Sequence, residues 1–234
     1  AICAGTDGAR HLAWADTTPG ESVIYTARYD GQNWPLAPIP NGKGSRPTLA
    51  ANGSTVHVAW QDRLASSEGA AFDVLACRRA DGGEWTLPDM VSDTRDLHSL
   101  LPRIAVNNQG ACHLVWQEER EGLYVIRHAD LWPEGWAQPV DVSDPLDDAR
   151  LAFALPNRWG QFQILWSEGS CLKHRVRAGA PQGQWQPTEV ACEACAGLSE
   201  LAAVLGEKGD LHAVFTRYSN GDRHTYYVKR KAID

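Results

Sequence analysis

A four-residue phrase recurs five times along the chain and constrains the fold more than any other feature. Each copy has a histidine or glutamine, then two small or aliphatic residues, then a large aromatic residue. The copies are HLAW (11–14), HVAW (57–60), HLVW (113–116), QILW (163–166) and HAVF (212–215). A second series, Trp34, Trp85, Trp136 and Trp185, lies between them in glycine-containing turns close to a proline. Repetition at about 50 residues predicts a fold built from copies of one supersecondary unit.

The second copy shows the predicted unit most clearly. Short apolar or alternating runs at 46–51, 55–62, 72–80 and 85–91 predict four strands. Asn-Gly and Asp-Gly turns, which favour hairpins, separate the first pair and the last pair of these runs. No helical period competes with this interpretation, so the chain is predicted to be all-β.

The spacing inside the phrase predicts how the units pack. His57 and Trp60 are three residues apart, and an odd spacing places two side chains on opposite faces of a strand. Both faces then need burial, which neighbouring sheets can provide and a single four-stranded sheet cannot. The sequence therefore predicts a five-bladed β-propeller of about 50-residue four-stranded repeats, in a single domain. The blades are expected at residues 1–44, 45–96, 97–147, 148–196 and 197–234.

Two alternatives remain open at this point. The fifth copy lacks a fourth strand, so either the fifth blade has three strands or the chain is part of a longer propeller. A β-sandwich is the competing fold, because sandwiches also consist of short strands, although they do not show a repeat this long.

The turn series resembles a known repeat. The segments RYDGQNWP (28–35) and RRADGGEWTLP (78–88) resemble degenerate Asp boxes, the BNR repeats of sialidase-type propellers. Asp30, Gly31 and Trp34 fit that motif, and Asp81 with Trp85 fits it with a shortened gap, whereas the third and fourth copies keep only glycine and tryptophan. The resemblance implies a sialidase-type β-propeller. It does not imply sialidase activity. A sialidase would use three arginines, of which only two candidates are found, and the Arg-Ile-Pro motif is missing.

Charged residues recur where each predicted second strand ends. The second residue after the aromatic is acidic in four copies and an arginine in the fifth, and two arginines open first strands at places that we take as equivalent. Loops at that end of a propeller usually form its binding face, so we expect these residues to surround a ligand pocket. The simpler interpretation is a solvated rim of ion pairs between blades. The seven candidates are Arg46, Arg150, Asp16, Asp62, Glu118, Glu168 and Arg217.

Three functions fit this arrangement. The leading hypothesis is non-catalytic glycan recognition of the lectin type, at pockets on the rim or between blades. The second is a protein–protein interaction module of a larger multidomain protein, and the third is a sialidase-like glycoside hydrolase, which would need two carboxyl groups about 5–10 Å apart. We assign no catalytic residue and no cofactor, and expect a glycan or a protein as the partner. Trp132 and Trp159 fall outside both aromatic series and are predicted on the side opposite the rim.

The histidines invite a metal hypothesis that the predicted geometry argues against. Ligands of zinc lie about 2.0–2.1 Å from the ion and must converge on one point. Second-strand histidines of different blades are spread around a ring, and Gln163 replaces histidine in the fourth copy, as a hydrogen-bonding role would allow. The remaining histidines, His98, His128, His174 and His224, show no metal-binding spacing. We therefore predict no metal site.

Composition sets the outer limits on function. The formal net charge of −7 argues against a nucleic-acid surface. The sequence has no run of about 18 apolar residues, so it predicts no membrane span. The six cysteines do not recur from repeat to repeat, which favours free thiols and a reducing, cytoplasmic compartment. Cys192 and Cys195 form one C-x-x-C pair, interpreted as incidental or as a local disulfide rather than a metal or redox site.

Overall fold

The computed structural model of this chain is built from β-strands. It describes residues 1–18, 20–63, 71–80, 82–92, 94, 96–157, 159–177, 183–193, 195, 197–219 and 221–231. This part of the chain contains 20 strands and no helical element, hence no helix long and apolar enough to cross a membrane. The all-β prediction is confirmed.

The strands form five antiparallel sheets that follow one another along the chain. The first sheet has β1 (Ile2–Ala4), β2 (Arg10–Asp16), β3 (Val23–Arg28) and β4 (Leu36–Lys43), and the second has β5 (Ser45–Asn52), β6 (Thr55–Asp62), β7 (Asp73–Arg79) and β8 (Asp89–Met90). The third has β9 (Ser99–Val106), β10 (Cys112–Arg120), β11 (Leu123–Trp132), β12 (Gly135–Trp136) and β13 (Val140–Asp141). The fourth has β14 (Ala149–Pro156), β15 (Phe162–Glu168), β16 (Cys171–Arg177) and β17 (Glu189–Cys192), and the fifth has β18 (Leu198–Leu205), β19 (Leu211–Ser219) and β20 (Asp222–Arg230).

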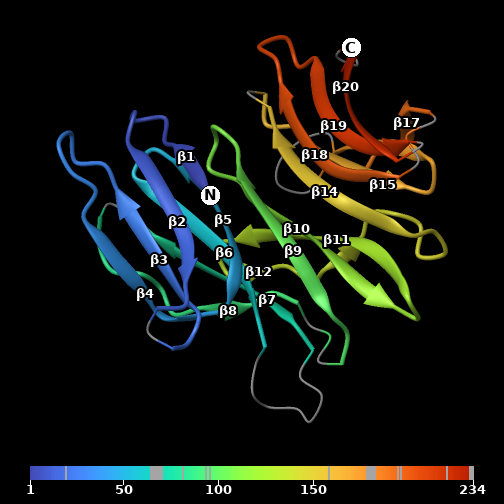
Figure 1. Ribbon diagram of the computed structural model, residues 1–234. Coiled ribbons are helices and arrows are strands. Elements are labelled where there is room, and N and C mark those ends of the chain that lie inside the picture. The colour runs from blue at the N-terminus through green and yellow to red at the C-terminus, as the bar shows by residue number, and fades with distance from the viewer. Residues whose placement is uncertain are drawn as a thin grey trace.

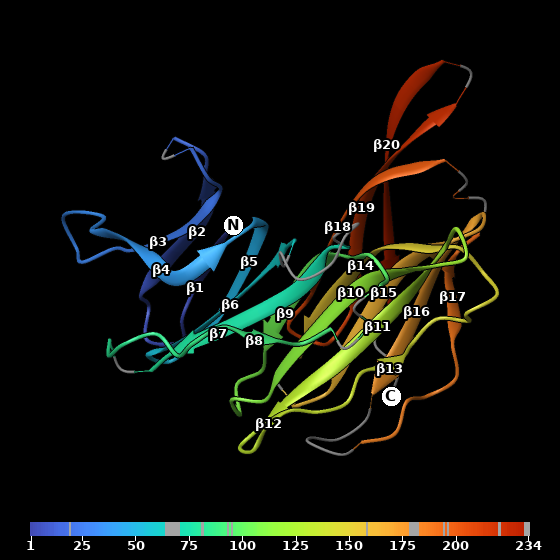
Figure 2. The same ribbon diagram turned by 90° about the horizontal axis from the view of Figure 1, so that it is seen from below.

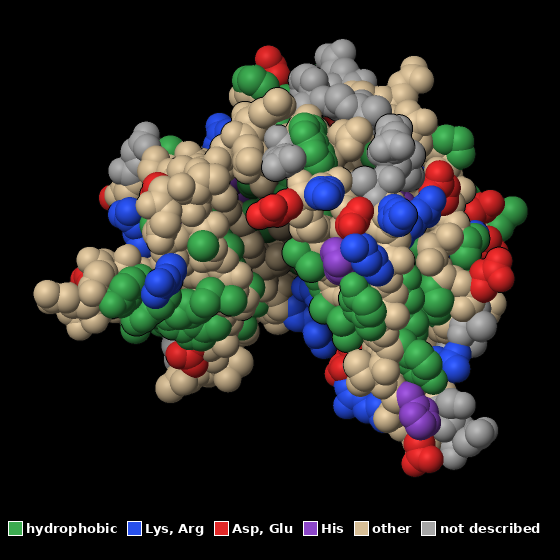
Figure 3. All heavy atoms as spheres, turned by 90° about the horizontal axis from the view of Figure 1, so that it is seen from above, with side chains coloured by type: hydrophobic (Ala, Val, Ile, Leu, Met, Phe, Trp, Pro, Cys, Tyr) green, Lys and Arg blue, Asp and Glu red, His purple; other side chains and the backbone are tan. Residues whose placement is uncertain are grey.

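The five sheets are arranged as an open arc. The first strand of each later sheet packs on the sheet before it. Strand β5 lies against β2, β9 against β5 and β6, β14 against β9 and β10, and β18 against β14. The first sheet, in blue, and the fifth, in red, stand at the two ends of this arc (Figures 1 and 2). In the described part of the chain they do not pack extensively on each other, and the space-filling view shows a notch between the two ends (Figure 3).

The recurring phrase lies on the second strand of every sheet and gives that sheet two different faces. We call the face that carries the phrase's large aromatic residue the aromatic face, and the opposite one the histidine face. The aromatic-face residues are Trp14, Trp60, Trp116, Trp166 and Phe215. The histidine-face residues are His11, His57, His113, Gln163 and His212. Strand alternation produces this division, as the odd spacing predicted.

The histidine face of each sheet packs on the aromatic face of the next. Ala13 of the first sheet meets Trp60 of the second, and the same pairing repeats at the next three interfaces. These pairs are Ala59 with Trp116, Val115 with Trp166, and Leu165 with Phe215. Trp60, Trp116 and Trp166 are completely buried. The apolar core is thus divided into four layers between five sheets.

The turn between β3 and β4 is closed by the aspartate of the first Asp-box-like segment. Asp30 Oδ1 accepts hydrogen bonds from the backbone N–H groups of Gln32, at 2.8 Å, and Asn33, at 2.6 Å. These bonds lower the pKa of Asp30, outweighing the opposing effect of desolvation. Trp34 then packs on Tyr29, with ring centroids 5.2 Å apart. Asp81, the aspartate of the second segment, lies outside the described residues.

Candidate functional site

The acidic and arginine series that the sequence indicated lies at one edge of the sheets. Asp16, Asp62 and Glu168 are the last residues of β2, β6 and β15, while Glu118 and Arg217 lie near the ends of β10 and β19. All five stand two residues after the aromatic residue and so belong to the aromatic face. Among the described residues, the side-chain partners given below for Glu118 and Glu168 come from their own sheets or the adjoining loop.

Glu118 and Glu168 are buried and tied into ion pairs. Glu118 Oε2 accepts a hydrogen bond from Thr94 Oγ1 at 2.8 Å, and Glu118 Oε1 lies 2.8 Å from Arg120 Nη2 and 3.4 Å from Arg127 Nη1. Glu168 accepts a hydrogen bond from Trp166 Nε1 at 2.8 Å and pairs with Lys173 Nζ at 2.6 Å. Both carboxylates therefore stabilise neighbouring strands and have little freedom to meet a ligand.

The other members of the series are more open. Asp16 accepts hydrogen bonds from the hydroxyl and the backbone N–H of Thr18, and these bonds lower the pKa of Asp16. Burial raises the pKa of Asp62, against the opposing effects of the Arg63 backbone N–H and of Lys43. Arg217 places its guanidinium 4.6 Å from the ring centroid of Tyr226.

Arg46 and Arg150 do not occupy equivalent places, and the expectation that they do is wrong. Arg150 is opposite Ser167 in the β14–β15 ladder, the position that Ser45 takes opposite Gln61 in the second sheet. Arg46 instead has a left-handed backbone, with φ of 53°, as Leu151 has, with φ of 55°. Both first strands carry the same irregularity, so the cross-strand register aligns Ser45 with Arg150 and Arg46 with Leu151, and matching arginine to arginine along the sequence misses this by one residue. Arg150 pairs with Asp148 Oδ2 at 2.7 Å.

A pocket opens at the opposite edge, between the third and fourth sheets. It has a volume of about 550 Å³ and combines indole rings, a guanidinium, a carboxylate and side-chain amides. Its lining residues are His128, Ala129, Asp130, Trp132, Ala137, Gln138, Val140, Arg177, Gly183, Gln184 and Trp185. Residues 178–182, between Arg177 and Gly183, lie outside the described residues.

Two tryptophans give the pocket its aromatic character. Trp185 forms an isolated β-bridge with Arg177 and packs its ring edge-on against His128, with centroids 5.2 Å apart. Trp132, at the end of β11, has a buried indole Nε1 with no hydrogen-bond partner among the described residues.

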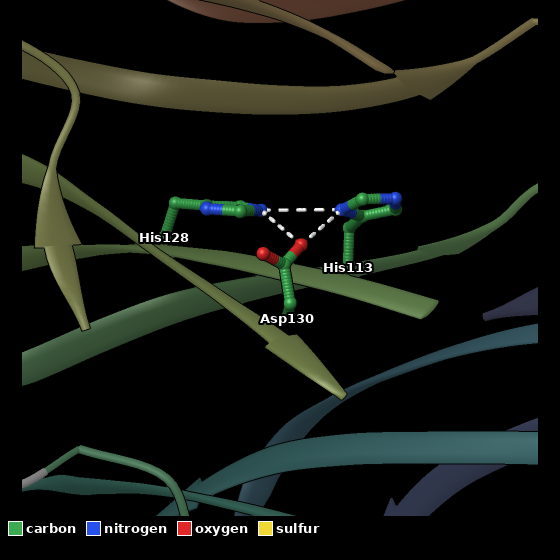
Figure 4. Close-up of side chains that lie close together, drawn as sticks. All are labelled: His113, His128 and Asp130. Atoms are coloured by element: carbon green, nitrogen blue, oxygen red, sulfur yellow. Dashed lines mark hydrogen bonds and ion pairs between the residues drawn. The ribbon is translucent and has the colours of Figure 1, made fainter. Parts of the chain in front are cut away.

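His128 and Asp130 of the pocket lining belong to a polar cluster with His113 (Figure 4). His113 Nδ1 lies 2.8 Å from Asp130 Oδ1 and 3.3 Å from His128 Nε2, and His128 Nε2 lies 3.4 Å from the same carboxylate oxygen. Arg177 of the fourth sheet donates to the other oxygen, Oδ2. Phe162, also from the fourth sheet, stacks on His113 with ring centroids 4.0 Å apart.

The surroundings favour the ionised carboxylate of Asp130 and the neutral imidazole of His128. Burial raises the pKa of Asp130, but hydrogen bonds from His113 and Arg177 and the charge of His128 outweigh it and bring the pKa to about 2. Burial lowers the pKa of His128 to about 3, against the opposing influence of Asp130. At neutral pH the wall of the pocket therefore presents one carboxylate held by one guanidinium.

The cluster arises from one hairpin, which the metal argument from sequence overlooked. His128 and Asp130 belong to β11, the strand beside His113, so the three residues do not come from the second strands of different sheets. Asp130 is directly opposite His113 in the register, and His128, two residues earlier, shares its face. The His-x-Asp spacing at 128–130, opposite a second-strand histidine, is the signal that could have revealed it.

The interface between the second and third sheets has pockets of its own, of about 240 and 460 Å³. His57, Arg78 and Leu131 line both of them. Arg78 is opposite His57 in the register, where Asp130 is opposite His113 in the third sheet. Of these two sheets, only the third has a carboxylate directly opposite the histidine of the phrase.

The six cysteines are free thiols, so the local disulfide considered for Cys192 and Cys195 is not formed. Both thiols lie near the backbone oxygen of Glu193, at 3.2 Å for Cys192 and 3.6 Å for Cys195. Burial, with the neighbouring Cys192, raises the pKa of Cys195 to about 12, which makes it a poor nucleophile.

Comparison with known proteins supports the class of fold. No protein family and no curated protein matches the sequence. The polysaccharide lyase Uly1 superposes with a TM-score of 0.63 at 12% identity, over 100% of this chain and 57% of its own. A PL25 ulvan lyase bound to -[GlcA(1-4)Rha3S]- gives 0.66 at 10% identity, over 97% and 67%. A leech intramolecular trans-sialidase gives 0.50 at 11% identity, over 90% and 36%.

These similarities concern the β-rich fold and the fact that the structural neighbours act on glycans. The structural neighbours are polysaccharide lyases and sialidase-like, glycan-active proteins with β-rich folds. The chain spans 57% of the length of Uly1. Identities of 10–12% establish likeness of fold alone, and activities and ligands come to this chain only as proposals.

Proposed function

We propose that this chain is a carbohydrate-binding β-propeller whose glycan site is the pocket between the third and fourth sheets. The observation that carries the proposal is the lining of that pocket. Trp132 and Trp185 offer apolar ring surfaces, while Gln138, Gln184 and the Arg177–Asp130 pair offer polar groups. Sites of this kind bind small ligands through apolar walls with a few placed polar groups. The glycan-active structural neighbours support a carbohydrate ligand.

The propeller part of the proposal rests on the packing of the sheets. In our proposal the five sheets are blades, at about 1–44, 45–96, 97–147, 148–196 and 197–234, of one propeller domain. Every blade meets the next through the same two faces, as repeat architectures require, and the Asp30 turn is the kind of turn that Asp-box repeats use. The three-stranded fifth sheet and the open arc fit a propeller in which the five sheets are consecutive blades.

Binding without catalysis follows from the state of the carboxylates. A glycosidase needs a protonated acid and a second carboxyl group about 5–10 Å away. Asp130 is the single carboxylate among the described lining residues, and the hydrogen bonds from His113 and Arg177 that lower its pKa favour the ionised form over a general acid. Glu118 and Glu168 are held in ion pairs. We therefore expect no turnover of a fluorogenic sialoside, and turnover that Asp62→Asn abolishes would reinstate the hydrolase hypothesis.

A glycan array that includes uronate-containing polysaccharides, followed by calorimetric titration of the strongest hit, tests the proposal. Trp132→Ala and Trp185→Ala should each weaken binding about 10-fold or more, since aromatic anchors are worth about 1–3 kcal/mol. Trp159→Ala is the matched control, because Trp159 is a turn tryptophan, 50% exposed, outside the pocket. A blank array, or equal affinities of all three variants, would reject a glycan site here.

A protein-interaction function is the second candidate, and the histidine face of the fifth sheet, which no other sheet in the described part of the chain covers, favours it. Val204, Val214 and Tyr227 are 61%, 44% and 60% exposed there. The other four histidine faces each receive an aromatic face, and the first sheet carries such a face with a half-buried Trp14. We therefore commit to a second copy of this chain as the partner, its first sheet docking on the fifth.

Light scattering after size-exclusion chromatography tests this second candidate. The wild type should form oligomers that Val214→Lys dissolves. Val190→Lys is the matched control, because Val190 is 46% exposed on a different sheet. A wild-type chain that remains monomeric at high concentration would end this candidate.

A further inference from the structure

We propose that His113, His128 and Asp130 form a binding site for a divalent transition-metal ion of the zinc class. Two imidazole nitrogens and one carboxylate oxygen converge on one point between the third and fourth sheets (Figure 4). This set of ligands is one that zinc accepts. The site shares His128 and Asp130 with the lining of the proposed glycan pocket, but neither tryptophan is a ligand and the metal site does not depend on that function.

The spacing of the three atoms suits tetrahedral coordination. Bonds of about 2.0–2.1 Å in a tetrahedron hold ligand atoms about 3.3 Å apart. His128 Nε2 lies 3.3 Å from His113 Nδ1 and 3.4 Å from Asp130 Oδ1, which already matches. The remaining separation, 2.8 Å between His113 Nδ1 and Asp130 Oδ1, is a direct hydrogen bond that an ion would replace by small side-chain movements.

Surrounding groups hold the ligands in place. Arg177 binds Asp130 Oδ2 and leaves Oδ1 turned toward the two imidazoles. Phe162 stacks on His113, and Trp185 packs edge-on against His128, so that both rings are fixed in orientation. Partners that orient ligating side chains in this way are a regular feature of metal sites.

The site has an open fourth position. Three protein ligands complete only part of a tetrahedron, and catalytic zinc sites leave the fourth place to water or substrate. His128 and Asp130 line the pocket of about 550 Å³, which gives an ion a route of entry and a place for that fourth ligand.

Equivalent positions in other sheets lack the set. In the fourth sheet Gln163 accompanies His174, at 2.8 Å, and Val176 replaces the carboxylate. In the second sheet Ala76 and Arg78 accompany His57. Within the described residues, this hairpin is the single place where three such ligand atoms lie within 4.8 Å of one another. A repeat that needed only buried polar filling would not require this combination.

Titration of the chelator-treated protein with Zn²⁺ and with Co²⁺ tests the proposal. One equivalent of Zn²⁺ should bind, and Co²⁺ should give the visible bands of a tetrahedral site without a thiolate-to-cobalt band in the near ultraviolet. His128→Ala should weaken Zn²⁺ binding by about 100-fold or more, and Asp130→Asn, which preserves shape, by about 10-fold or more. His174→Ala is the matched control and should bind within about two-fold of the wild type, because His174 lies at the equivalent place in the fourth sheet.

Three results would overturn the site. These are a wild type that binds no Zn²⁺, an equal loss in His128→Ala and His174→Ala, or a thiolate band that Cys192→Ser removes. Circular dichroism of each variant separates loss of a ligand from loss of the fold, and Asp130→Asn decides the question if His128→Ala does not fold. Because the readout is the metal alone, failure here leaves the glycan proposal standing, and a blank glycan array leaves the metal site standing.

Discussion

The histidine faces of the fourth and fifth sheets carry the same pattern but have opposite surroundings. Leu165 of the fourth sheet is completely buried, whereas Val214, at the equivalent place of the fifth, is 44% exposed. Gln163 contacts His174 at 2.8 Å inside the protein, and His212 contacts the Tyr227 hydroxyl at 2.7 Å at the surface. The difference is that the fifth sheet covers the fourth, and among the described residues nothing comparable covers the fifth. A strand therefore offers a face, and a neighbour decides whether that face becomes core.

The aromatic faces show the same contrast at the other end of the arc. Trp166 is completely buried against the third sheet, while Trp14 is only half-buried and stacks on Tyr25 of its own sheet, with centroids 5.8 Å apart. Identical strand positions should therefore differ in their contribution to stability.

The largest expected effect is at the aromatic faces. Trp166→Ala should lower the free energy of unfolding by about 3–5 kcal/mol, because it removes a buried indole and leaves a cavity. Trp14→Ala should cost roughly half of that or less, since part of its surface already meets water. Urea unfolding of both variants measures the difference. Equal losses would show that the end face is covered in solution.

Charge burial gives the next comparison. Arg177→Met leaves Asp130 buried without its guanidinium, and breaking a buried pair costs about 3–5 kcal/mol. Arg150→Met breaks the exposed pair with Asp148, which should cost about 0–1 kcal/mol. The same urea measurement applies. Asp130→Asn combined with Arg177→Met should recover part of the loss, whereas additive losses would contradict an interaction between the two residues.

The histidine faces provide a third and closely matched pair. Leu165→Ala should cost about 2–5 kcal/mol, as truncation of a buried leucine does. Val214→Ala, at the equivalent exposed place, should change stability by no more than about 0.5 kcal/mol when the protein is monomeric. A large loss in Val214→Ala at low protein concentration would mean that the fifth sheet is covered by residues outside those described.

The smallest effect concerns pH and the covered histidines. Burial, with Arg230, lowers the pKa of His174 to about 4 from 6.5, and burial, with Arg78, does the same for His57. Above pH 6.5 both histidines are neutral in the folded and in the unfolded chain, and the stability of the folded protein is not reduced by their burial. As the pH falls from 6.5 to about 4, each histidine becomes protonated in the unfolded chain but stays neutral in the folded protein. The free energy of unfolding therefore falls by about 1 kcal/mol per pH unit for each histidine.

His174→Gln tests this dependence, because glutamine cannot titrate and Gln163 shows that an amide is accepted in such a layer. The variant should show a shallower decline of the urea midpoint between pH 6.5 and 4. A slope identical to that of the wild type would remove His174 from the explanation.

Much of the fold could be predicted because its signal is local. The phrase around Trp60 placed a second strand at 55–62, where β6 lies, and the three-residue spacing to His57 predicted two buried faces. The metal-ligating candidates could not be predicted in the same way. His128 and Asp130 lie beside His113 only because of the cross-strand register. The orientation of the three side chains also depends on Arg177 and Phe162, which come from another sheet. The misplaced equivalence of Arg46 and Arg150 has the same origin, since only the pairing with the second strand, Ser45 with Gln61 and Arg150 with Ser167, shows which residues correspond.

The sequence by itself determined the repeated sheets and the two faces of every second strand, because side-chain alternation and turn formation depend on residues a few positions apart. Only the tertiary structure decided which faces are covered, that the first and fifth sheets lie apart in the described part of the chain, and that a histidine pair and a carboxylate share one point. Those outcomes depend on contacts between segments far apart in the chain, where a shift of one residue moves a side chain from the core to water.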